Sequence, residues 1–156
     1  GQGYKGPIMA RRVLKGIRLL GGKGLMAETA ENYGHRKMIV WQNLDKMEMM
    51  VQKVILPAIP KNSFNLIDQI DRACGSCGAN FIEGYYSGFI KEYMRFLSYS
   101  KRSLAELQYW IRLIFHKGFI TQNIYSEFDS LAIRTMFLLN RLINALDEKQ
   151  RARKGP

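Results

Sequence analysis

Cys74 and Cys77 are the first residues in the sequence whose types and spacing could do chemistry. Two thiols three residues apart form a redox pair in a βαβ context, or half of a zinc site. The sequence supplies neither context, because no strand pattern surrounds the pair and no second pair of ligands follows it. Cys77 instead falls on the apolar stripe of a predicted helix, where a free cysteine packs as a small hydrophobic residue. We therefore expect neither a metal nor a redox function here.

Two histidines, His35 and His116, are the remaining candidates for catalysis. A di-iron site in a helical bundle needs Glu-x-x-His pairs, but the residue three before His116 is Leu113. The chain also lacks a nucleophile elbow, a phosphate-binding glycine loop and a dinucleotide fingerprint. With so few groups for acid–base catalysis, the sequence predicts a protein with no catalytic residues and no cofactor.

The net charge of +11 is the unusual property of this chain of 156 residues. Residues 1–37 carry eight basic and two acidic side chains, a net charge of +6. Residues 38–148 carry twelve and eleven, a net charge of +1, and residues 149–156 carry four basic side chains and no acidic one. A nearly neutral core with basic ends predicts an anionic partner, with nucleic acid first and a membrane surface second.

The N-terminal segment 1–37 is a basic arm that holds eight of the fourteen glycines, a density that opposes stable helix. Within it, helical spacing over residues 8–20 separates an apolar side from a basic side. The basic side consists of Arg11, Arg12, Lys15 and Arg18. Two interpretations stand: a short amphipathic helix that forms on RNA, DNA or a membrane surface, and a disordered arm or leader sequence. The tail 149–156 is the second basic arm, with Arg151, Arg153 and Lys154.

A basic stripe runs along the third predicted helix. At 100° per residue, Lys91, Arg95 and Arg102 fall within about 40° of one another, opposite the apolar residues. Tyr109 lies on the same side, so a base could stack on it while an arginine pairs with phosphate. A solvated helix face with i,i+4 ion pairs explains the same residues without a ligand. We predict that the two arms make the main nucleic-acid contacts and that this stripe is auxiliary.

Four amphipathic segments predict an all-α protein, an antiparallel up-down-up-down four-helix bundle with basic N- and C-terminal arms. The predicted helices cover residues 38–56, 63–84, 87–117 and 122–149. Pro57 and Pro60 are expected to end the first helix, and Gly118 the third. Ser63 and Thr121 are candidate N-caps. The bundle itself is expected to span residues 38–148.

The second and third helices also carry a combined motif. Its parts are Gln69-Ile70-Asp71-Arg72-Ala73, Ser76, Asn80, Glu83-Gly84, Lys91-Glu92, Arg95-Phe96-Leu97 and Ser103-Leu104-Ala105-Glu106-Leu107. This pattern resembles the bacterial four-helix-bundle family encoded in intervening sequences of 23S ribosomal RNA genes. The resemblance covers about residues 38–148 and leaves both basic segments outside. One departure is Cys77-Gly78, where the family commonly has Ile-Pro, and it leaves the expected fold unchanged.

The resemblance implies a non-enzymatic homopentamer that associates with nucleic acid, RNA more than DNA. The family is also similar in fold to the accessory variability protein of diversity-generating retroelements, a basic pentamer that binds a reverse transcriptase and RNA. The motifs fit the intervening-sequence family better, whereas the strong basicity fits the retroelement role at least as well. A reverse transcriptase therefore remains an alternative candidate partner.

The cellular compartment follows from what the sequence lacks. No apolar run reaches the length of a membrane span, and the first residues do not form a secretory signal pattern. Only two cysteines are present, too few for a disulfide framework. These observations predict a cytoplasmic protein without integral membrane association.

Overall fold

The computed structural model describes residues 33–156, and every regular element in this part is helical. The elements are η1 (Gly34–Lys37), α3 (Ile39–Met50), η2 (Val51–Ile55), α4 (Leu56–Ala58), α5 (Phe64–Tyr85), α6 (Ile90–His116) and α7 (Gln122–Lys154). η2 is a π-helical turn that joins α3 to α4, so these three form one continuous segment. The predicted all-α class and the four long helical segments are confirmed for the described part of the chain.

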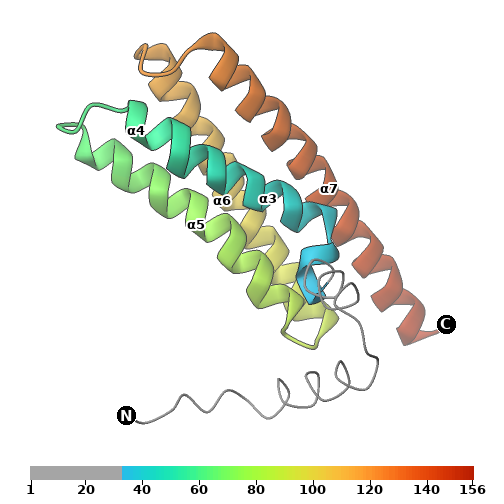
Figure 1. Ribbon diagram of the computed structural model, residues 1–156. Coiled ribbons are helices and arrows are strands. Elements are labelled where there is room, and N and C mark those ends of the chain that lie inside the picture. Colours follow the sequence, from blue (N-terminus) through green and yellow to red (C-terminus); the bar gives the residue numbers. More distant parts are fainter. Residues whose placement is uncertain (1–32) are drawn as a thin grey trace, which may run out of the picture. The chain divides into compact units, whose positions relative to one another are not determined.

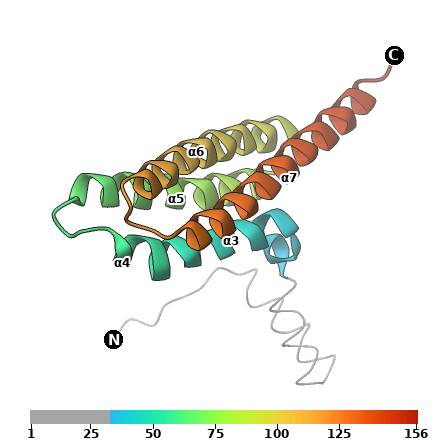
Figure 2. The same cartoon turned by 90° about the horizontal axis from the view of Figure 1, so that it is seen from above.

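The chain divides into two units between Lys37 and Met38, and the four long segments all belong to the second unit. Figure 1 shows these segments side by side, with the chain turning back at each loop. α5 packs against α6, α6 against α7, and α3 contacts both α5 and α7. Figure 2 shows the C-terminal end of α7 projecting beyond the other helices.

The first helix does not end at Pro57, which corrects the prediction. A proline inside an α-helix loses one hydrogen bond and clashes with the carbonyl four residues earlier. The wider π turn η2 ends at Ile55, two residues before Pro57, and such a turn accommodates a break in the α-helical ladder. The segment ends at Ala58, and Ile59 is extended with φ −81° and ψ 133°. Since a residue before proline avoids the α conformation, Pro60 explains this end.

The connection between α6 and α7 follows the predicted signals. Gly118 has φ +79°, a conformation that favours glycine. The amide of Gly118 donates to the carbonyl of Phe115 at 2.9 Å and the amide of Phe119 donates to that of Ile114 at 3.0 Å, which is the Schellman pattern. Thr121 then caps α7, because its Oγ1 accepts a hydrogen bond from the amide of Ile124. Ser63 also occupies an N-cap position, but without a side-chain hydrogen bond.

The basic tail differs from the prediction, because α7 continues to Lys154 and makes residues 149–154 part of the helix. Lys, Arg, Gln and Ala favour helix, and basic side chains near a helix C-terminus interact favourably with its dipole. Arg151 also pairs with Asp147 one turn earlier, at 2.8 Å. The chain leaves the helix at Gly155, which has φ +63°.

The core lies between the four segments and is almost entirely apolar. The predicted stripe of α5 is buried at Ile70, Ala73, Cys77 and Phe81. Phe128 of α7 and Met47 of α3 are likewise buried, at 0% and 1% exposure. The buried residues of α6 include Leu97, Leu104, Leu107, Ile111 and Ile114. All four segments therefore supply large side chains to one continuous core.

Two hydrogen bonds join α5 to α6, and one of them lies within the combined motif. The hydroxyls of Ser76 and Ser103 are 2.8 Å apart, and within α5 Asn80 donates to the carbonyl of Ser76. The buried hydroxyl of Ser100 donates to the carbonyl of Cys77 at 2.7 Å. α5 passes through Cys77 and Gly78 without a break. These contacts give the motif a structural role, because small polar residues let two helices approach closely while their polar groups stay satisfied.

Gly84 of α5 packs tightly against Tyr93 and Phe96 of α6, and this contact yields a stability prediction. A Cβ at this position would lie 2.9 Å from Cβ of Phe96 and 3.2 Å from the carbonyl oxygen of Tyr93. We expect Gly84→Ala to lower the free energy of unfolding by about 1–3 kcal/mol, the usual cost of overpacking. Urea denaturation followed by circular dichroism measures this change.

Gly75→Ala is the matched control in the same helix. A Cβ at Gly75 meets nothing within 4 Å, so the substitution adds helix propensity without a clash. We expect it to raise the free energy of unfolding by about 0.5–1 kcal/mol. A similar effect of both substitutions would contradict the packing assigned to Gly84.

Candidate nucleic-acid interface

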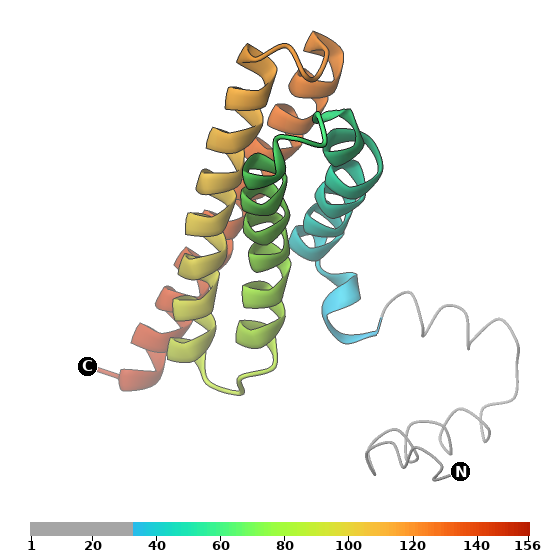
Figure 3. The same cartoon turned by 90° about the vertical axis from the view of Figure 1, so that its left-hand side faces the viewer.

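The start of α6 and the end of α7 enclose a groove with a volume of about 330 Å³. Its lining residues are Gly88, Phe89, Ile90, Lys91, Gln150, Arg153 and Lys154. We call this the basic groove. Figure 3 shows the last turns of α7 beside the start of α6. The opposite directions of the two helices therefore bring together two segments that are far apart in the sequence.

The charge of the basic groove is uniformly positive. Lys91, Arg153 and Lys154 are all exposed, and no acidic residue lines the groove. Within residues 33–156, none of these three cations forms a salt bridge. Phe89 at the N-cap of α6 offers no side-chain cap, and the first amides of a helix favour an anion. The groove is therefore suited to phosphate.

Three predicted site residues meet in the basic groove, and the other described ones do not. Lys91 comes from the predicted third-helix stripe, whereas Arg153 and Lys154 come from the predicted tail. Sequence reasoning placed them on separate surfaces, because periodicity describes one helix at a time. The geometry joins them into one positive site.

The remaining arginines of the stripe and tail have partners within the protein. Arg95 pairs with Glu92 at 2.7 Å and lies over the ring of Phe96. Arg102 lies over the ring of Tyr99, 5.8 Å from its centroid. Arg151 pairs with Asp147. Exposed ion pairs and cation–π contacts are weak, so the three arginines stay accessible on the surface outside the groove.

The four N-terminal candidates, Arg11, Arg12, Lys15 and Arg18, lie outside the described residues. Tyr109 is 60% exposed and its ring packs against Trp110, but it does not line the groove. Sequence reasoning missed Phe89, which does line the groove and is 73% exposed. The sequence did contain a signal for this residue: an aromatic side chain directly after Gly88, in front of the apolar residues of the predicted third helix.

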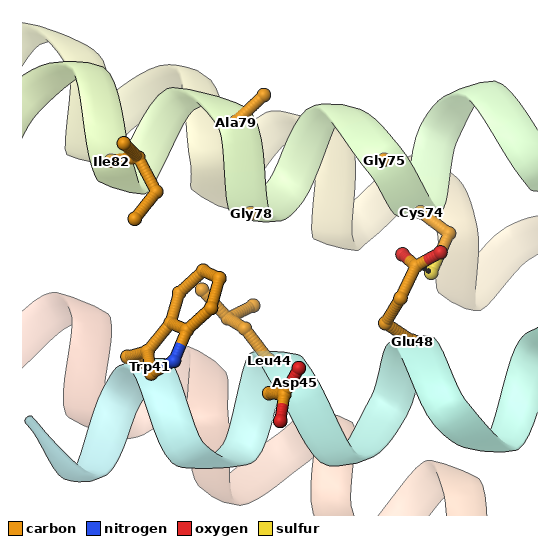
Figure 4. A pocket seen from close by; sticks show the side chains of 9 residues that line it. All are labelled: Trp41, Leu44, Asp45, Glu48, Cys74, Gly75, Gly78, Ala79 and Ile82. Atoms are coloured by element: carbon orange, nitrogen blue, oxygen red, sulfur yellow. Dashed lines mark hydrogen bonds between the residues drawn. The ribbon is translucent and has the colours of Figure 1, made fainter. Parts of the chain in front are cut away.

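A second groove, between α3 and α5, has a volume of about 360 Å³ and a different chemistry. Figure 4 shows its lining residues, with Trp41, Leu44, Asp45 and Glu48 on α3 facing Cys74, Gly75, Gly78, Ala79 and Ile82 on α5. Its charged side chains are two carboxylates, Asp45 and Glu48. Carboxylates repel phosphate, so this groove is unsuited to nucleic acid.

The two cysteines of the sequence lie in or beside this second groove, and both are free and buried. The Sγ of Cys74 donates a hydrogen bond to Oε2 of Glu48 at 3.0 Å. Burial, followed by this hydrogen bond, raises the pKa of Cys74, and burial raises the pKa of Cys77 to about 12. Since the thiolate is the reactive form, both thiols are poor nucleophiles near neutral pH.

Two properties of residues 33–156 bear on metal binding and on membrane insertion. No cluster of three or more His, Cys, Asp or Glu side chains there is arranged to hold a metal ion. None of the helices in that range combines the length and apolar character needed to cross a membrane.

The fold and the basic groove together define a class of small helical protein with four long segments and a cationic site at one end. The sequence profile of the 23S rRNA-intervening sequence protein family matches residues 36–141. Because this match covers most of the chain, the protein belongs to that family, which confirms the resemblance found in the sequence. No curated protein sequence matches the chain significantly. The family match ends before Arg153 and Lys154, so one wall of the basic groove lies outside it.

Proposed function

We propose that this protein is a non-enzymatic accessory protein of the 23S rRNA intervening-sequence type that binds nucleic acid, RNA in preference to DNA. The observation that supports this function best is the convergence of Lys91, Arg153 and Lys154 on one groove that no acidic residue lines. Phosphate contacts by Lys and Arg provide most of the affinity in sequence-independent binding. The N-terminal arm, with Arg11, Arg12, Lys15 and Arg18, adds further contacts.

The protein acts as a closed homo-oligomer, a homopentamer of up-down-up-down bundles, in the cytoplasm. Exposed apolar side chains support self-association, since such surface commonly marks an interface. The most exposed large hydrophobic residues besides Phe89 are Phe64, Ile39, Phe137 and Tyr109, at 67%, 62%, 61% and 60%. A ring would also present several basic grooves to one RNA, which raises avidity without any new contact.

The test is a titration of the full chain against a fluorescent structured RNA over a salt series, read by anisotropy, with light scattering on the same sample. We expect binding at low salt, a steep loss of affinity as salt rises, and the mass of a closed oligomer. Absence of binding at low salt would refute the nucleic-acid function, and a monomeric mass would refute the assembly. A chain that retains a co-purified reverse transcriptase but no RNA would favour the retroelement alternative.

A further inference from the structure

Phe89 is an exposed aromatic residue in the basic groove, which three cations also line. Phe89 is 73% exposed, more than any other large hydrophobic residue in the described part of the chain. Leaving such a ring in water forfeits about 2 kcal/mol of burial. The ring nevertheless belongs to the basic groove together with Lys91 and Arg153.

The backbone around Phe89 is held in place although the ring is exposed. The carbonyl of Phe89 accepts a hydrogen bond of 2.9 Å from the amide of Tyr93, at the start of α6. The hydroxyl of Ser87 donates to the carbonyl of Gly84 at 2.8 Å and so ties the preceding turn to the end of α5. With the backbone held, only the side-chain torsions of Phe89 have to be ordered when a ligand binds, which limits the entropic cost of binding.

The approach to the ring is open on the side of Gly88. Gly88 has φ +80°, and a Cβ there would meet nothing within 4 Å. This φ favours glycine, which has no side chain, so the space next to Gly88 in the turn that carries Phe89 is open. A flat group can therefore reach the ring while an attached anion reaches Lys91, Arg153 and Lys154.

We propose that Phe89 is a stacking platform for one unpaired nucleobase, and that the basic groove thereby selects single-stranded over duplex nucleic acid. The inference rests on the proposed function and adds the form of nucleic acid that the groove takes. The base stacks on Phe89, and the adjoining phosphate lies among the three cations. In a duplex the bases are stacked inside the helix, so only the phosphates are available to the groove. Base–aromatic stacking is insensitive to sequence, so all four bases are accepted.

The experiment compares three probes of equal length: a short single-stranded oligoadenylate, its abasic counterpart, and a duplex. The protein is the full chain, and the variants are Phe89→Leu, which keeps an apolar side chain but removes the ring, and Phe89→Tyr, which keeps the ring. We expect the wild-type protein and Phe89→Tyr to bind oligoadenylate roughly tenfold more tightly than the abasic strand. Phe89→Leu loses this preference but keeps the salt dependence, because its phosphate contacts remain.

Three results would overturn the inference, and they separate it from the proposed function. Salt-dependent binding by wild type with equal affinity for the oligoadenylate and abasic strands removes the stacking role and leaves the nucleic-acid function intact. A smaller mass of Phe89→Leu in light scattering identifies the ring as a subunit contact instead. Absence of binding to every probe at low salt overturns the proposed function and this inference with it.

Discussion

Changing Lys91, Arg153 and Lys154 together to glutamine is expected to weaken RNA binding by roughly tenfold or more at moderate salt. Each cation that contacts a phosphate of a single strand contributes about 0.7 to the log–log salt slope, so three losses should flatten the slope by about 2. The substituted side chains are exposed, and glutamine favours helix. We therefore expect the fold to be retained, as circular dichroism would show.

The matched control changes Lys46, Lys53 and Lys61 to glutamine. These lysines are also exposed, and the substitution removes the same charge from α3, η2 and the turn before α5. If the basic groove contacts the RNA, the control variant loses less RNA affinity than the groove variant. Its log–log salt slope also stays steeper. Equal losses in the two variants would mean that overall charge, rather than the groove, determines binding.

Alanine at Arg11, Arg12, Lys15 and Arg18 is the second change with a large expected effect. It removes four of the eight basic side chains of the N-terminal segment, and four lost contacts flatten the salt slope by about 2.8 for single strands. The bundle should remain folded, because these positions precede the unit that begins at Met38. Anisotropy over the same salt series measures the change.

A second variant of the segment separates the two interpretations of residues 8–20. It changes the apolar side, Met9, Val13, Ile17 and Leu20, to alanine and leaves every charge in place. A helix that forms on its target through an apolar face would lose affinity in both variants, whereas an unstructured basic arm would lose it only in the first. Unchanged binding by the charge variant would show that the segment makes no contact.

The fold was predictable because its signals are local. Apolar stripes with helical spacing placed α5, α6 and α7, and Gly118 and Thr121 marked the turn between the last two. The errors have local causes too. Pro57 was assigned as a helix end, because a sequence does not reveal that a π turn precedes it. The basic tail was separated by its charge, although residues with high helix propensity continue α7 to Lys154.

The sequence predicted the cations of the basic groove but not the groove itself. Lys91, Arg153 and Lys154 were each selected for their charge, but their meeting depends on the packing of α6 against α7, which no single helix encodes. Phe89 was missed because its significance lies in exposure, and a sequence pattern records only that the residue is apolar. The sequence also did not show which carboxylates Arg95 and Arg151 pair with; in the structure these are Glu92 and Asp147.

Photo-crosslinking of the full chain to an RNA that carries 4-thiouridine, followed by mass spectrometry of the linked peptides, tests the central claim most directly. Our account predicts crosslinks in the turn and first residues of α6, around Phe89 and Lys91, and in the last turns of α7, around Arg153. Crosslinks from the N-terminal segment are expected as well. Crosslinks confined to the second groove, between α3 and α5 around Asp45 and Glu48, would contradict this account.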